Sequence, residues 1–219
     1  MVTLDEIREM VEGIRSELDV EDELRENALK LTREIVRLSG DAVKALHRRD
    51  FEEARKRLDE AREKVSSLRD MLKGHEAIYF TGYVQTAHQE LVEALLLYSY
   101  FMAERAPTHE ELGIPAADYV LGLGDFIGEL RRHFLITLME GRLERAEEVF
   151  RFMEAVYHEL MTLDYPKGLV NVRQKQDQAR RVVERTLEDI TRAKLEGRLE
   201  ELLTATVERL DGGGGDRTR

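Results

Sequence analysis

Apolar residues recur three and four positions apart along most of the chain, the spacing that gives a helix one buried face. One stripe consists of Leu24, Ala28, Leu31, Ile35 and Leu38, and a second of Ala54, Leu58, Ala61, Val65, Leu68 and Leu72. No segment shows the alternation that is typical of strands. The pattern therefore predicts an all-α protein, built as a single-domain antiparallel helical bundle.

Turn residues and capping residues divide this pattern into about seven helices. Asp50 and Glu53 have the spacing of a capping box at the start of the second helix, and Gly74 marks its end. The later helices are expected at about residues 75–104, from near 115 to 141, at 142–161, at 169–195, and in a short segment after Gly197. Residues 105–114 are expected to form a loop, and residues 164–168 a turn.

Composition supports one folded domain over residues 1–210. The chain has 219 residues, of which 42% are hydrophobic, enough to build a core and to exclude disorder of the whole chain. Residues 211–219 contain four consecutive glycines, and we expect a disordered tail there. Because there is no cysteine, disulfides, zinc–thiolate sites, iron–sulfur clusters and thiol nucleophiles are excluded.

The sequence favours a cytoplasmic protein without a membrane partner. Its start, MVTLDEIREM, is acidic where a signal peptide is basic. The longest run with little charge covers residues 91–102 and is far shorter than the roughly 20 apolar residues that a membrane-spanning helix needs.

Two predicted helices carry acidic residues where apolar residues are expected. The run LVEALLLYSYFM contains Glu93 as its only charge, and Glu90 lies three residues earlier on the same helical face. The run YVLGLGDFIGEL contains Asp125 and Glu129, four residues apart, and no other charge. An ionised carboxylate is costly to bury, so such groups are paired with a cation, protonated or bound to a metal.

Two interpretations of these four acids follow. In the first, they form buried ion pairs with Arg131, Arg132 or an arginine elsewhere. In the second, the two helices pack antiparallel, and the four carboxylates form an oxygen-rich site that suits Mg²⁺ or Mn²⁺. Gly122, Gly124 and Gly128 would let a neighbouring helix come close. The chain has no HExxH and no Glu-x-x-His motif, which argues against a zinc protease and a ferritin-like di-iron site.

Two segments resemble the translin and Trax family. They are HQELVEA, residues 88–94, and DYVLGLGDFIGELRR, residues 118–132; residues 164–190 are similar to the C-terminal segment shared by that family. The resemblance implies an all-helical protomer in a closed octameric shell that binds single-stranded RNA or DNA. Trax-type members carry a metal-dependent endoribonuclease site made from four acids, whereas translin-type members bind without it.

The resemblance also assigns roles to residues. Glu90, Glu93, Asp125 and Glu129 match the four acidic positions of the Trax-type site, as metal ligands and catalytic residues. The loop at 105–114 is shorter than the one expected in eukaryotic Trax, so the chain resembles a compact prokaryotic or archaeal member. Such a member could form a homo-oligomer without a separate translin partner.

Nucleic-acid binding would need local basic clusters, because the net charge of −11 opposes nonspecific attraction to a polyanion. The candidate clusters are Arg131 with Arg132, Arg48 with Arg49, and Lys56 with Arg57. Aromatic residues that could stack on bases are Tyr79, Phe80 and Tyr83, although Phe80 is expected in the core. His88 is expected to be a partly exposed bystander.

The favoured function is therefore a Mg²⁺- or Mn²⁺-dependent endoribonuclease that acts on single-stranded RNA within a homo-octameric shell. A non-catalytic shell that binds single-stranded RNA or DNA is the main alternative. An all-α nucleotide pyrophosphatase, which also places acidic pairs on adjacent helices, is less favoured.

Overall fold

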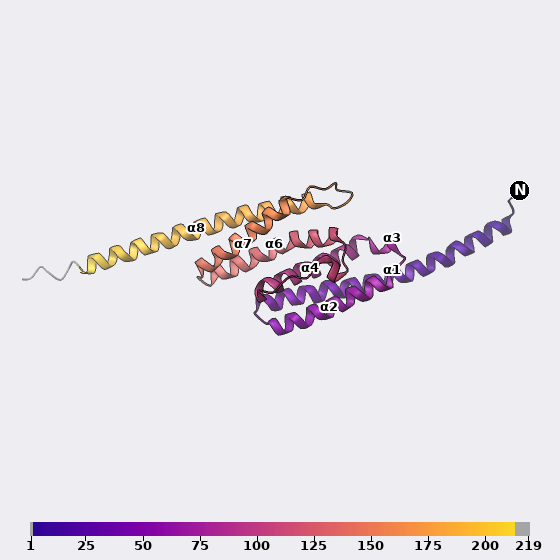
Figure 1. Ribbon diagram of the computed structural model, residues 1–219, viewed down its shortest axis with the longest axis horizontal. Helices are drawn as coiled ribbons and strands as arrows, with labels where there is room; N and C mark the ends of the chain where they lie inside the picture. Colours follow the sequence, from indigo (N-terminus) through magenta and orange to yellow (C-terminus); the bar gives the residue numbers. More distant parts are fainter. Residues whose placement is uncertain (1, 213–219) are drawn as a thin grey trace, which may run out of the picture. The chain divides into compact units, whose positions relative to one another are not determined.

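The computed structural model describes residues 2–212, which form eight helices and no strand (Figure 1). The chain divides into two compact units: residues 1–126 with 165–172, and residues 127–164 with 173–219. The single domain expected over residues 1–210 stays a prediction. The all-α prediction is confirmed. Most of the tail expected at 211–219 lies outside the described residues, although the last helix continues to Gly212.

The first unit is built on three long helices: α1 (Leu4–His47), α2 (Phe51–Met71) and α4 (Gly82–Met102). Both apolar stripes contribute to its core, as expected. An ion pair between Glu34 and Lys64 joins α1 to α2, which run antiparallel on either side of a short turn. The ring of Phe101, near the end of α4, lies 6.3 Å from that of His47 at the end of α1, so these two helices run in the same direction.

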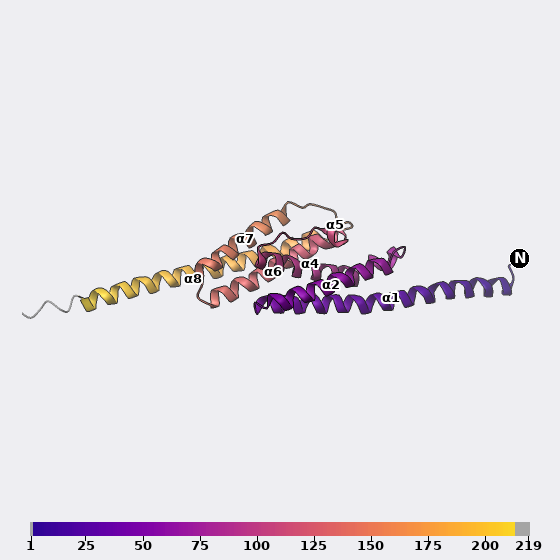
Figure 2. The same cartoon turned by 60° about the horizontal axis from the view of Figure 1, so that its bottom comes forward.

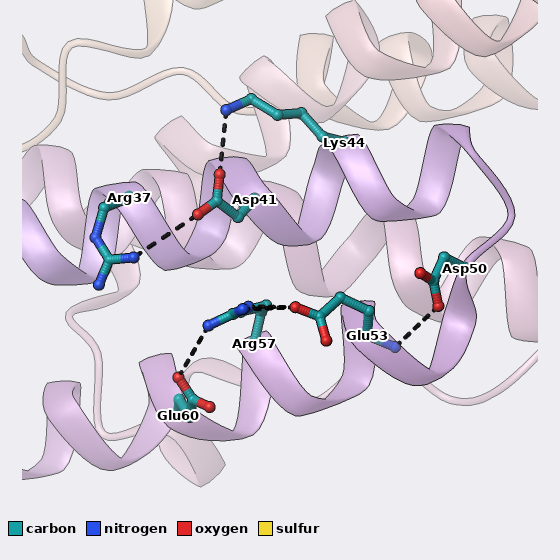
Figure 3. A network of polar contacts seen from close by, with 7 residues as sticks. All are labelled: Arg37, Asp41, Lys44, Asp50, Glu53, Arg57 and Glu60. Atoms are coloured by element: carbon teal, nitrogen blue, oxygen red, sulfur yellow. Dashed lines mark hydrogen bonds and ion pairs between the residues drawn. The ribbon is translucent and has the colours of Figure 1, made fainter.

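Asp50 begins α2, as predicted, but only half of the expected capping box forms. The backbone N–H of Glu53 donates to the Asp50 carboxylate at 3.2 Å. The Glu53 carboxylate does not return the bond to Asp50; it accepts from Arg57 instead, at 2.7 Å from Nε. Figure 3 shows this chain of contacts continuing from Arg57 to Glu60.

Two expectations for the segment after α2 were wrong. The helix expected at 75–104 is broken into α3 (Glu76–Tyr79) and α4, because Thr81 takes an extended conformation (φ −76°, ψ 154°). The loop expected at 105–114 contains a one-turn helix, α5 (His109–Leu112). A capping box between Thr108 and Glu111 starts α5.

The second unit contains most of α6 (Ala116–Met139), α7 (Leu143–Met161) and α8 (Val172–Gly212). The buried side-chain amide of Gln176 donates to the carbonyl oxygens of Leu160 and Leu163, which fixes α8 antiparallel to α7. The expected break at Gly197 was wrong, because α8 is continuous through it. A glycine inside a helix costs only about 0.5–1 kcal/mol relative to alanine, too little to end a helix whose neighbours favour it.

The first half of α1 extends past the helices that pack on its second half (Figure 2). It carries an exposed apolar seam, defined here as Leu4, Ile7, Val11, Ile14 and Leu18. The spacing of this seam alternates between three and four residues, as in the contact face of a coiled coil. Exposed leucines also lie along the C-terminal half of α8, among them Leu195, Leu199 and Leu202. In the part of the chain that is described, no helix is long and apolar enough to cross a membrane.

Candidate active site

Helices α4 and α6 approach each other closely at Gly122. A β-carbon at this position would lie 2.8 Å from the carbonyl oxygen of Gln89 and 2.8 Å from the β-carbon of Val92. The close approach that the glycines of α6 predicted is therefore confirmed at Gly122. At Gly128 it is not found, because no atom lies within 4 Å of the position that a β-carbon would take.

A buried polar pair joins the same two helices one turn earlier. Nδ1 of His88 lies 2.7 Å from Oδ2 of Asp118, and Nε2 of Gln85 donates to Oδ1 of Asp118 at 2.9 Å. The His88 side chain is 0% exposed, so the expectation of a partly exposed bystander was wrong. Burial, followed by the charge of Asp118, raises the pKa of the neighbouring Tyr79 phenol.

These contacts fix the relative direction of α4 and α6. Asp118 contacts Gln85 and His88, and Gly122, one turn later on α6, meets Gln89 and Val92, one turn later on α4. The two helices therefore run parallel here, and the antiparallel packing expected for the metal site was wrong. In this arrangement the next turn of α4 carries Glu93 and the next turn of α6 carries Asp125, so the acids still follow the close contact on both helices.

The four predicted acids are all partly buried. Glu90, Glu93 and Asp125 belong to the first unit and are half-buried. Glu129 is 18% exposed and lies one turn after Asp125 on α6, beyond the point where the second unit begins. Because these carboxylates are partly exposed, a ligand can reach them from solvent.

The ion-pair interpretation can be tested at the two arginines that it named. Arg132 lies 3.8 Å from Glu129, and its side chain is half-exposed, so this pair is weak. Arg131 turns to α8, where it donates to Thr186 at 2.6 Å and to Asp189 at 2.9 Å. Neither of these two arginines forms a buried ion pair with the four acids, and pairing with an arginine elsewhere stays a prediction.

The donor chemistry suits a hard divalent cation, since carboxylate oxygens are the ligands that Mg²⁺ and Mn²⁺ prefer. Within residues 2–212, no three His, Asp or Glu side chains are already gathered in a way that could hold one ion. Binding of one ion would therefore require these side chains to change conformation.

The basic clusters predicted for nucleic-acid binding differ in availability. Arg57 contacts both Glu53 and Glu60, and Arg131 is only 22% exposed in its contacts with α8, so neither presents a free charge to a phosphate. Arg132 is half-exposed, beside Glu129. The remaining predicted residues are exposed, namely Arg48, Arg49 and Lys56. Their role in binding stays a prediction.

Phe80 was expected in the core, which was wrong. It is 68% exposed at the break between α3 and α4, and its ring packs edge-on against Tyr79 with 5.2 Å between centroids. Beside it lies a hollow of about 480 Å³ whose lining includes Arg69 and Lys73 as well as Asp70 and Glu76.

Comparison with known proteins identifies relatives over most of the chain. The family model described as "Translin family" matches residues 6–191. The uncharacterized protein MJ0175 of Methanocaldococcus jannaschii is 37% identical over 192 residues, which cover 87% of this chain and 83% of that protein. Translin-associated protein X of Rattus norvegicus is 25% identical over 185 residues, 66% of this chain and 64% of that protein.

Solved structures show the same fold. The crystal structure of AfC3PO has a TM-score of 0.76 and 33% identity, covering 85% of this chain and 98% of that one. The structure of AfC3PO in complex with duplex RNA has a TM-score of 0.66 and 31% identity, covering 85% of this chain and 97% of that one.

Proposed function

Because the chain belongs to the translin family, we propose that it is a divalent-metal-dependent endoribonuclease that binds and cleaves single-stranded RNA as a homo-oligomer. The observation that carries this proposal is the contact at Gly122, after which α4 and α6 present acids on successive turns. Glu90, Glu93, Asp125 and Glu129 are the proposed ligands of Mg²⁺ or Mn²⁺. They are also the four positions that match the acidic set of Trax-type members.

The chemistry of this site follows from its charge. Four carboxylates repel an RNA phosphate, so the substrate can approach only when a cation balances them. A divalent ion bound there would supply charge stabilisation at the phosphate and would activate a water. The carboxylates would hold the ion, and one that is not bound to it would accept the proton that the attacking water loses.

Two observations support RNA as the ligand. A structure of the related AfC3PO in complex with duplex RNA has been solved. In this chain, Phe80 presents an exposed aromatic ring on which an unpaired base could stack. Because stacking on an aromatic ring requires a base that has left the duplex, we propose a single-stranded substrate.

Assembly is supported by the apolar seam of α1. Isolated helices of this length are marginally stable in water, and the first half of α1 packs on nothing within the described residues. A second copy of the chain could cover the seam, and an octamer is the arrangement that the family resemblance implies. Single-stranded DNA remains a possible second ligand of such an assembly.

The proposal is tested with the purified full-length chain and single-stranded RNA that is labelled at both ends. Cleavage with Mg²⁺ or Mn²⁺ that EDTA abolishes, and that yields internal cuts from either label, is the expected result. Binding without cleavage under every divalent cation would favour the non-catalytic shell. Hydrolysis of dNTPs with Mg²⁺, in the absence of RNA cleavage, would favour the pyrophosphatase.

A further inference from the structure

The buried His88–Asp118 pair joins α4 to α6 by hydrogen bonds and leaves one histidine nitrogen without a partner in the described part of the chain. Both side chains are almost fully enclosed, and the two oxygens of Asp118 accept from His88 and from Gln85, all within α4 and α6. A carboxylate can only accept, so Nδ1 of His88 carries the hydrogen of the short contact. Nε2 of His88 is buried and has no hydrogen-bond partner among the described residues.

Such a pair is a poor source of stability. Desolvating a charged or strongly polar pair usually costs about as much as the contact returns, and an apolar pair of similar size often serves a core better. The unpartnered Nε2 adds a further cost. What a buried directional contact does provide is one defined register between the elements that it joins.

The register of α4 against α6 also sets where the acids of the two helices lie relative to one another. Glu90 lies two residues after His88 on α4, and Asp125 lies seven residues after Asp118 on α6. Slippage by a single residue along a helix moves a side chain by about 1.5 Å along the axis and turns it by about 100°. The positions of the acids along the two helices decide whether their side chains can reach one ion, so a slip of this size would separate them.

Gly122 contributes to this register, because a residue with a side chain would not fit at the contact. A glycine makes no directional side-chain bond between α4 and α6, however. The directional bonds from His88 and Gln85 to Asp118, one turn earlier, fix where along each helix the contact occurs. Asp118 is also in the first turn of α6, where the helix dipole favours its negative charge.

We propose that His88 and Asp118 are positioning residues, which lock α4 against α6 so that Glu90, Glu93 and Asp125 can converge on one divalent cation. This inference rests on the proposed function of those acids. It differs from a purely structural role because it requires the cation affinity to depend on the pair.

The test measures Mn²⁺ binding to the full-length protein by isothermal titration calorimetry, together with urea unfolding. Asp118→Ala should weaken Mn²⁺ binding by about tenfold or more, the usual effect of losing a group that supports metal ligands. Asp118→Asn, which keeps an oxygen acceptor for His88, should recover part of that loss. Gln85→Ala, which removes only one of the two bonds, should weaken binding less than Asp118→Ala does and provides a milder variant should Asp118→Ala not fold.

Gln176→Met is the matched control. It removes two hydrogen bonds of a buried amide in the second unit, so it should lower the urea midpoint and leave Mn²⁺ affinity unchanged. If the folded Asp118 and Gln85 variants bind Mn²⁺ as wild type does while their urea midpoints fall, the pair is only structural and the inference is overturned. If wild type itself binds no Mn²⁺, the proposed metal site fails, and the positioning role fails with it.

Discussion

A β-carbon at Gly122 would come within 2.8 Å of the β-carbon of Val92, closer than two carbon atoms can pack. Helix α6 therefore touches α4 through its backbone at this point. The half-buried acids of both helices follow on the next turns. Substitution at this glycine is thus a direct test of whether the contact matters to the site.

Gly122→Ala should destabilise the protein, because the added methyl group meets the backbone of Gln89 as well as Val92. Overpacking of this kind costs roughly 1–3 kcal/mol in the free energy of unfolding. Gly128→Ala is the control: its methyl group enters open space on the same helix, so it should be neutral or add about 0.5–1 kcal/mol. Equal urea midpoints for the two variants would show that α4 and α6 are not in tight contact.

Phe80→Ala should weaken the binding of single-stranded RNA without affecting folding. Loss of one stacked base costs about 1–3 kcal/mol, which corresponds to roughly a 5- to 150-fold rise in Kd. Fluorescence anisotropy in EDTA measures this without cleavage. Tyr165→Ala removes another exposed aromatic ring and should leave the Kd unchanged. A Phe80 variant that binds as wild type does would show that RNA does not stack there.

The apolar seam of α1 predicts the assembly. Wild type should have a solution mass several times 25.4 kDa by light scattering. Ile14→Glu places a charge in the seam and should lower that mass while the helical circular dichroism spectrum is retained, because Ile14 is exposed and lies outside the core of the first unit. Ser16→Glu, on the opposite face of the helix, should not change the mass. A monomeric wild type would remove the shell hypothesis.

Acid should loosen the segment around α5. Bonds from the Arg105 guanidinium and from the backbone of Thr108 lower the pKa of Glu111 to about 2, from an ordinary value of 4.5. Because the ionised form is favoured in the folded state, its contribution is complete above pH 4.5 and is lost as the pH falls through 2. Hydrogen exchange at Leu112 should therefore be faster in Glu111→Gln than in wild type at pH 7, and this difference should shrink between those two values. A difference that does not depend on pH would contradict the assignment.

The regular parts of the fold could be predicted because their signals are local. The stripe that includes Ala54, Leu58 and Val65 is buried as its periodicity indicates. Glycine and capping residues located the start of α2 and both ends of α7. The outcome at two other positions could not be predicted from residue type. Helix α8 continues through Gly197, whereas the helix expected at 75–104 is interrupted at the extended Thr81, which is not a strong helix breaker. Single-residue preferences are too small to decide such cases.

The site could be predicted in its residue types but not in its arrangement. Glu93 and Asp125 stand out because they interrupt apolar runs. The bond between His88 and Asp118 spans 30 positions in the sequence, and no local pattern indicates which residues meet across that distance. The direction of α6 relative to α4 depends on the path of residues 103–115, which their sequence does not specify.

The central claim is that the four acids cleave RNA by holding a divalent cation. The most direct test compares cleavage of single-stranded RNA by wild type, Glu129→Gln and the exposed control Glu23→Gln, with Mg²⁺ and with EDTA, alongside RNA affinity and melting temperature. Glu129→Gln should lose cleavage by orders of magnitude while it keeps its RNA affinity and its stability, because the substitution removes the negative charge of a metal ligand and preserves the size of the side chain. Glu23→Gln should cleave as wild type does. Undiminished, EDTA-resistant cleavage by a well-folded Glu129→Gln would contradict the claim.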